Sequence, residues 1–312
     1  MTDSQRPSSP SPALLPPSRH DVARREALIN RLIAVSGYSA IVFVVLVFVF
    51  LLRESLPAID PDILPKAFQL RWYPIEDYFG LLPLLAGTLV VTFGAALFAV
   101  PLGIGTAIFI AEIAPRWARE ILKPLVEALA GIPSVVLGFL GMLLLSPILR
   151  ETFNLPTGLT ALTGAILLGL ISLPTIVSVA EDALDAVPRS YRDASLAIGA
   201  TELQTIFLVT LPAARSGVIT AILLGLGRSI GETMTVMMVT GNAPVLRMSL
   251  LTPVRTMTAT IAAEMGEVAK GSDHYHMLFL IGLLLFLISL VINLTAVSVI
   301  FRQKKRAERI LS

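Results

Sequence analysis

Two charged residues stand alone deep inside a long apolar run of this sequence. Arg228 and Glu232 lie in the stretch GLGRSIGETMTV. Their i,i+4 spacing predicts that both side chains lie on one face of a helix, within reach of each other. An arginine at the centre of a membrane helix costs about 2.5–3.5 kcal/mol on insertion scales, so its charge must be compensated. Two interpretations follow: a structural ion pair that faces other helices, or a charged point on the path of a solute.

An anion is the solute that an arginine would favour. Its guanidinium group is planar, stays protonated and offers two parallel N–H donors to an oxyanion. Thr233 and Thr235 add hydroxyl groups nearby, although a threonine in a membrane helix often bonds its own backbone. Gly227 and Gly231 form a small-xxx-small pair, which is typical of close helix packing.

A hydrolytic site is a weaker interpretation of the same residues. Residues 227–231 match the G-x-S-x-G pattern, but that pattern requires a strand-to-helix elbow and a histidine partner. The histidines are His20, in the N-terminal tail, and His274 and His276, which we expect to be exposed in a loop without further metal ligands. The sequence therefore predicts no catalytic residue and no metal site in this chain.

Composition places the chain in a membrane. Of its 312 residues, 55% are apolar and only 15% are charged, and the mean hydropathy is +0.80. A soluble domain carries roughly a quarter charged residues. The absence of cysteine excludes disulfides and thiolate sites. No G-x-x-x-x-G-K-[ST] loop occurs, so we expect no cofactor on this chain, and any ATP would be hydrolysed by another chain.

Six apolar runs are long enough to cross a bilayer, which needs about 20 helical residues. They lie at Leu32–Leu52, Leu81–Ala111, Ala128–Leu149, Leu155–Ala180, Ser216–Leu246 and Met277–Phe301. The second run must tilt, bend near Pro101 and Gly103, or extend into the interface, and Pro124 and Pro133 predict a kinked entry to the third. Trp72, Tyr73, Tyr78 and Phe79 precede the second run and predict an outer interfacial belt of aromatic side chains.

The distribution of basic residues predicts the orientation of the chain. Most Lys and Arg residues lie in the N-terminal tail, the 112–127 loop, the segment after residue 188 and the C-terminus. The positive-inside rule places these segments and both termini in the cytoplasm. The predicted parts are a disordered tail (1–30), a first transmembrane helix (31–53), a periplasmic loop (54–80), a transmembrane domain (81–301) with a periplasmic insertion at 242–276, and a basic cytoplasmic tail (302–312).

A polar segment at 189–212, RSYRDASLAIGATELQTIFLVTLP, separates two of the apolar runs. Pro188 suits the first turn of a short helix, and Gly199 suits the left-handed residue that ends it. Thr201 and Gln204 have the spacing of a capping box and predict a second helix start. Pro212 is expected to break the run before the chain becomes apolar again.

This segment resembles the motif of permease subunits of ATP-binding-cassette (ABC) importers. That motif has an acidic-Ala-Ala start, a glycine four residues later and an aliphatic-x-Leu-Pro end. The matching residues here are Asp193, Ala194, Ser195, Gly199, Val209, Leu211 and Pro212, with mild departures at the acidic residue, the second alanine and the aliphatic position. The resemblance implies an all-α membrane protein with a MetI-like, type I importer core, whose short coupling helix docks into a cytoplasmic ATPase.

The stretch GLGRSIGETMTVMMVTGN (225–242) narrows the resemblance to the PstC family of phosphate-specific permeases. Residues 79–117, 127–141 and 249–267 agree with it, so the likeness runs from about Phe79 to Phe301. In that family the motif's Arg and Glu are implicated in transport, and they match Arg228 and Glu232. Glu232 could hold Arg228 while the path is empty, or accept a proton from hydrogen phosphate, which fully ionised sulfate cannot offer.

The resemblance implies a multi-pass protein of the bacterial inner membrane that imports inorganic phosphate within a complex. The implied partners are a homologous PstA-like permease, a PstB-like ATPase dimer that uses the ATP, and a periplasmic PstS-like phosphate-binding protein, with lipid around the complex and no nucleic acid. The alternatives are import of another oxyanion (phosphonate, sulfate or molybdate), or a secondary anion transporter that uses Glu232 as a proton relay.

Overall fold

The computed structural model describes residues 19–311, and the chain divides into two units, residues 1–50 and 51–312. Residues 1–18 of the predicted disordered tail lie outside the described residues. Helix α1 (Arg19–Ser55) begins well before residue 31, so the prediction of disorder was wrong for residues 19–30. The reason is local: RHDVARREALIN is rich in Ala, Arg, Glu and Leu, which favour helix, and it contains no Gly or Pro.

The second unit is almost entirely helical. Its long helices are α2 (Leu82–Ile108), α6 (Ala161–Asp185), α9 (Leu211–Gly231) and α12 (Asp273–Leu311). The shorter ones are α3 (Arg116–Ala130), α4 (Ser134–Leu140), α5 (Ser146–Thr152), α7 (Arg189–Ala197), α8 (Glu202–Thr205), α10 (Met234–Val239) and α11 (Met257–Glu264). Three π-helical turns join some of them: η4 (Phe109–Ile113), η5 (Gly141–Leu145) and η6 (Ile206–Thr210).

Six helical segments in the described residues are long and apolar enough to span a membrane, as predicted. They are Leu28–Ile59, Leu82–Ile113, Ser134–Thr152, Ala161–Asp185, Glu202–Gly231 and Asp273–Val299. The third begins after Pro133, which separates α3 from α4 instead of kinking one helix. The fifth begins and ends about four turns earlier than the run at 216–246 suggested. Arg228 therefore lies near the end of the fifth span, and Glu232 lies just beyond it.

Pro212 does not break the fifth span, contrary to the prediction. Helix α8, the π turn η6 and α9 follow one another without a gap, and Pro212 is the second residue of α9. A proline normally clashes with the carbonyl four residues before it and removes a backbone hydrogen bond. A π turn widens the helix and re-pairs its carbonyls, so η6 accommodates the ring. The 189–212 segment is thus continuous with the membrane helix.

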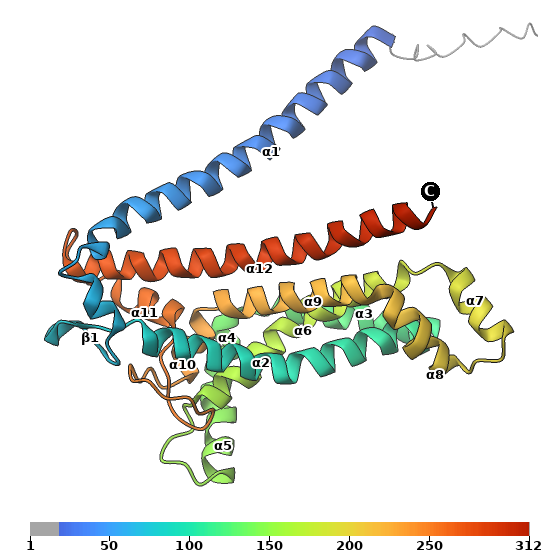
Figure 1. The fold of residues 1–312 in the computed structure, drawn as a ribbon. Helices are drawn as coiled ribbons and strands as arrows, with labels where there is room; N and C mark the ends of the chain where they lie inside the picture. Colours follow the sequence, from blue (N-terminus) through green and yellow to red (C-terminus); the bar gives the residue numbers. More distant parts are fainter. Residues whose placement is uncertain (1–18, 312) are drawn as a thin grey trace, which may run out of the picture. The chain divides into compact units, whose positions relative to one another are not determined.

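Helices α2, α6, α9 and α12 run alongside one another, with α7 and α8 at one end and α11 at the other (Figure 1). Small residues allow α2, α6 and α9 to approach closely. Ile176 of α6 is fully buried, and a Cβ added at Gly103 of α2 or at Gly225 of α9 would overlap its side chain. The core on either side is made of Val, Leu, Ile and Ala side chains, most of them from these helices and the others from η4, η6, α10 and two connecting segments. The packing fixes how α9 faces α6.

Residues 51–80 and 241–276 close one end of this unit. They contain the 3₁₀ turns η1 (Leu56–Ile59), η2 (Leu64–Phe68) and η3 (Pro74–Glu76), the strands β1 (Trp72–Tyr73) and β2 (Tyr78–Phe79), and α11. Trp72 pairs with Phe79, and both are buried, whereas Tyr73 pairs with Tyr78 and both are exposed. Because neighbouring residues of a strand point to opposite faces, only the tyrosines fit the predicted interfacial belt. The prediction was wrong for Trp72 and Phe79.

Candidate functional site: a broken helix with an exposed arginine

The charged motif lies at a break in the fifth span. Helix α9 ends at Gly231, and Glu232 has extended backbone angles (φ −69°, ψ 131°) before α10 begins at Met234. The assumption of a continuous helix through Glu232 was therefore wrong. Among the residues that the structure describes, no ion pair joins Arg228 to Glu232. The break turns the two side chains away from the i,i+4 geometry that the sequence suggested.

Arg228 is exposed on the last turn of α9, within a segment that is otherwise apolar enough to span the membrane. Its Nη1 donates a hydrogen bond to Thr175 Oγ1 of α6, at 3.3 Å. That single neutral contact leaves most of the donors of the guanidinium group available. An arginine exposed to lipid would carry the insertion cost given above, so this side chain must face water or another subunit.

Glu232 is half-buried and holds the two sides of the break. Its carboxylate accepts a hydrogen bond from the backbone N–H of Thr235 (3.3 Å), in the first turn of α10, and its backbone carbonyl accepts one from the hydroxyl of Thr258 (2.9 Å) in α11. Thr235 is fully buried, and its hydroxyl donates to the carbonyl of Ser134 at the start of α4 (2.9 Å). The break is therefore fixed by contacts with α4 and α11.

A small cavity lined by both polar and apolar side chains lies beside Glu232. The cavity has a volume of about 10 Å³, which is room for roughly one water. Hydroxyl groups from three elements line it together with Glu232: Thr88, Thr92, Ser229, Thr256 and Thr258. The sequence analysis missed the threonines of α2 and of the 256–258 segment, because a threonine in an apolar run is indistinguishable from one that only bonds its own helix.

The remaining residues of the motif have local roles. Ser229 is buried, and its hydroxyl is hydrogen-bonded to that of Ser172 in α6. The hydroxyl of Thr233 donates to the carbonyl of Gly231 (3.2 Å). A Cβ added at Gly227 would make only an ordinary contact with Ile292, and one at Gly231 would meet nothing within 4 Å. In this chain the predicted small-residue pair does not form a tight helix contact, a role that Gly225 fills instead.

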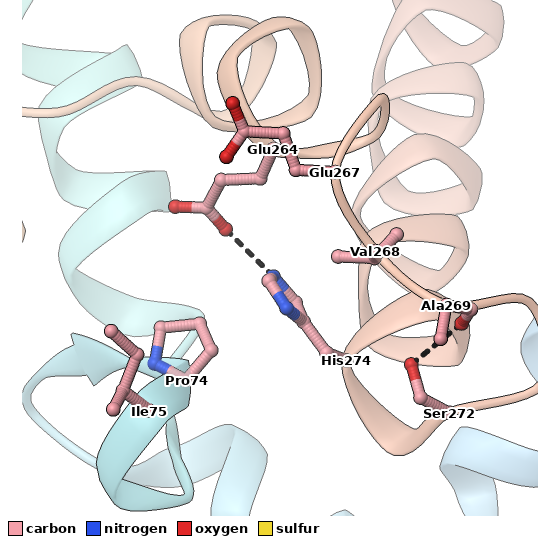
Figure 2. Close-up of a pocket in the computed structure, with 8 residues that line it drawn as sticks. All are labelled: Pro74, Ile75, Glu264, Glu267, Val268, Ala269, Ser272 and His274. Carbon is pink, nitrogen blue, oxygen red and sulfur yellow. Dashed lines mark hydrogen bonds and ion pairs between the residues drawn. The ribbon is translucent and has the colours of Figure 1, made fainter.

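The loops at 51–80 and 241–276 contain a larger pocket of about 520 Å³. Figure 2 shows Pro74 and Ile75 on one side of it, and Glu264, Glu267 and His274 on the other. None of the predicted transport residues lines this pocket. Glu264 accepts from Trp72 Nε1 (2.9 Å) and pairs with Arg255 (2.6 Å) and His274 (2.8 Å).

The partners of Glu264 decide its ionisation. Burial alone would raise the pKa of this carboxyl group, but the hydrogen bond from His274, the charge of Arg255 and the Trp72 donor outweigh burial, and the pKa lies below its ordinary value. His274 and His276 are half-buried, not exposed as predicted, because both lie in the first turn of α12, where His274 contacts Glu264 and His276 Nδ1 lies 2.8 Å from the carbonyl of Glu54.

The predicted capping chemistry of the 189–212 segment is confirmed. Gly199 has φ +93°; its N–H donates to the carbonyl of Leu196, and the N–H of Ala200 donates to that of Ser195. This pair of bonds is the Schellman arrangement that ends a helix. Thr201 and Gln204 form the reciprocal capping box that starts α8. Pro188 lies one position before the first turn, where Arg189 begins α7.

The residues of the importer-like motif differ in their exposure to solvent. Asp193, Ala194 and Gly199 are exposed, as is Pro212, while Leu211 is half-buried. Ser195 is buried and its hydroxyl lies 3.0 Å from that of Thr205, which joins α7 to α8. Arg192, the residue before Asp193, was not predicted as a functional residue, because a basic residue in a polar loop carries no distinguishing signal.

Comparison with known proteins places the chain in a family. The sequence model described as "Binding-protein-dependent transport system inner membrane component" matches residues 99–306. This chain belongs to that family. The match includes α7, the break at Glu232 and the loops after it, whereas Thr88 and Thr92 of the small cavity and Pro74 and Ile75 of the larger pocket lie before the matched region.

Similar proteins carry more specific names. "Probable ABC transporter permease protein YqgH" of Bacillus subtilis is 42% identical over 71% of this chain and 72% of its own length. "Phosphate transport system permease protein PstC" of Mesorhizobium japonicum is 38% identical over 71% and 73%, and that of Xylella fastidiosa is 33% identical over 77% and 79%. An inward-facing structure of the MetNI methionine ABC transporter matches with a TM-score of 0.52 and 21% identity, over 68% of this chain and 93% of that one. This last likeness confirms the predicted MetI-like fold.

Proposed function

We propose that this multi-pass membrane protein is the permease subunit of an ATP-driven importer, and that its solute is inorganic phosphate. The family match and the relatives named PstC support this function. The observation that carries the site is the exposed Arg228, which is charged, has one neutral partner and lies on a membrane-spanning helix next to its break. A guanidinium with free donors is suited to a partly dehydrated oxyanion.

Within this proposal the residues of the motif have different roles. Arg228 contacts the anion, and the carboxylate of Glu232 lines the path beside the break, where it can take a proton from hydrogen phosphate. Thr233 lies at the same break and offers its hydroxyl to the path. Thr235 contributes by holding α10 against α4, since its hydroxyl is bonded to Ser134. Phosphonate, sulfate and molybdate remain the competing solutes.

The proposal requires partners. A second, homologous permease would cover the face that exposes Arg228, a cytoplasmic ATPase dimer would bind the exposed residues of α7, and a periplasmic binding protein would deliver phosphate. The ATP is hydrolysed on the ATPase subunits, and both termini lie in the cytoplasm. The uneven distribution of basic residues and the exposed face of α7, with Asp193 and Ala194, support this arrangement.

Uptake of labelled phosphate by the reconstituted complex tests the site. Arg228→Gln should reduce uptake at least 100-fold while the complex still assembles, because the amide keeps hydrogen-bonding capacity but loses the charge that offsets dehydration of the anion. Arg228→Lys should retain partial uptake, since it keeps the charge but loses the planar fork. Arg31→Gln is the control: Arg31 is exposed on α1, outside residues 99–306, and its loss should leave uptake unchanged.

Two results would refute parts of this proposal. Normal uptake by Arg228→Gln would exclude Arg228 from the path. Wild-type complex that transports sulfate or molybdate in preference to phosphate, measured by competition against labelled phosphate, would keep the permease and change the solute.

A further inference from the structure

One side chain of helix α7, that of Arg192, forms its hydrogen bonds to η4 and to the end of α6. Arg192 donates from Nε and Nη2 to the two carboxylate oxygens of Glu112, at 3.1 and 2.6 Å. It also donates to the carbonyls of Leu184 (2.9 Å) and Val187 (2.8 Å), at the end of α6. The guanidinium therefore bonds the carboxylate at the end of the second span and also the carbonyls at the end of α6.

The ion pair is well shielded from solvent. The side chain of Arg192 is 20% exposed and that of Glu112 is 8% exposed, so water screens their attraction little. A bidentate arginine–carboxylate pair also fixes the relative orientation of its two elements, which a lysine would not do. Glu112 lies in η4, the π turn at the end of the second span, and such turns often occur at functional sites.

The other side-chain hydrogen bond of α7 joins it to α8. Ser195 bonds Thr205 of α8, and the helix is otherwise largely exposed. Among the described residues, the hydrogen bonds and ion pairs that join α7 to η4 and to the end of α6 all come from Arg192. Helix α6 in turn carries Thr175, the hydrogen-bond partner of Arg228. The polar side-chain link from α7 to η4 at the end of α2 therefore consists of a single guanidinium, which also bonds the carbonyls at the end of α6.

We propose that the Arg192–Glu112 pair is the link that passes movement of α7 to α2 and α6, and that it positions α7 for coupling of ATP hydrolysis to transport. This inference rests on the proposed importer function. The link acts at the cytoplasmic ends of the spans, and neither residue contacts the solute. Loss of the pair should therefore uncouple the complex without changing what it transports.

The chain offers a matched control at the same place. Arg119 of α3 donates to the carbonyls of Ile110 and Ala111 and pairs with Asp185 at 3.2 Å. It thus bonds the same two helix ends as Arg192 does, but from α3, not from α7. Removal of Arg119 tests whether any loss of a polar contact here has the same effect.

The experiment measures ATP hydrolysis and phosphate uptake by the reconstituted complex, with and without phosphate-loaded binding protein. Glu112→Gln and Arg192→Gln should keep basal hydrolysis within about twofold, lose at least tenfold in phosphate moved per ATP, and keep the wild-type KM for phosphate-loaded binding protein. The double variant should be no worse than Arg192→Gln alone, because both changes cut one link. Arg119→Gln should keep the wild-type ratio.

Three results would overturn the proposal: a wild-type ratio in both single variants, an equal loss in Arg119→Gln, or additive losses in the double variant. If Arg192→Gln fails to assemble, Glu112→Asp keeps the charge and shortens the reach by one methylene, and a wild-type ratio in that variant would overturn the proposal as well. Failure of the proposed function has a different signature, since the wild-type complex itself would then move no phosphate.

Discussion

Glu264 shows how one residue can organise a region that the sequence describes only as a loop. Its carboxylate joins Trp72 from β1, Arg255 before α11 and His274 from α12. The rings of Trp72, Phe79 and His274 pack on one another, with centroids 5.8–6.0 Å apart. Strand β1, which is distant in sequence, therefore meets the segments on either side of α11 at one negative charge.

The lowered pKa of Glu264 predicts how acid acts on this region. Stability from a carboxylate with a depressed folded-state pKa is fully present above the ordinary value of about 4.3 and is lost as pH falls through the lower folded value. Glu264→Gln should destabilise the protein by about 2 kcal/mol above pH 5, and the difference from wild type should shrink below about pH 4.

Thermal unfolding of the purified complex across pH checks this expectation. Glu267→Gln is the control, because Glu267 is exposed in the same pocket and makes no ion pair among the described residues. A pH-independent difference for Glu264→Gln, or an equal effect of Glu267→Gln, would contradict the assignment.

At the scale of elements, α6 and α9 pack closely where the side chain of Ile176 fits against Gly225. The side chain of Ile176 fills the space left by glycines on two neighbouring helices. Gly225→Ala should cost about 1–3 kcal/mol by overpacking and lower the yield of assembled complex. Gly231→Ala, six residues on, should be tolerated by the chain, since its Cβ would meet nothing within 4 Å. Complex yield and thermal stability of the two variants give the comparison, and equal behaviour would refute this packing argument.

Local chemistry explains which elements the sequence predicted. The apolar runs predicted the number of spans, although the fifth lies about four turns earlier than its run. Gly199 marked the end of α7, and Thr201 and Gln204 marked the start of α8, because caps depend on residues close in sequence. The break at Glu232 was missed because it is stabilised from outside, by Thr258 of α11 and by the packing of Thr235 on α4. Periodicity alone cannot show such a break.

The candidate site was predicted in composition but not in geometry. The sequence identified Arg228 and Glu232 as unusual charges for an apolar run, yet paired them with each other. Their actual partners, Thr175 and Thr235, depend on how α6 packs on α9 and on where α10 begins. For the same reason the tie between Arg192 and Glu112, 80 residues apart, carried no signal in sequence.

For the whole molecule, the testable property is its orientation in the membrane. Helix α7 and the α11–α12 connection lie at opposite ends of the long helices (Figure 1). The sequence has no cysteine, so the thiol introduced by Ser190→Cys or by Lys270→Cys would be the single site that a thiol reagent can label on this chain. Both positions are exposed. We expect an impermeant thiol reagent to label Lys270→Cys in intact cells and Ser190→Cys only after the membrane is opened. Labelling of both in intact cells would refute the proposed topology.

The uninterrupted helical path through Pro212 has a mechanical consequence. The segment Glu202–Gly231 has 30 residues, which at 1.5 Å each make a rod about 45 Å long, whereas the hydrocarbon core is about 30 Å thick. One end therefore projects beyond the hydrocarbon as a lever, next to α7. A rotation of about 5° about that end would displace Arg228, about 39 Å away along the helix, by about 3 Å, which is roughly the length of a hydrogen bond.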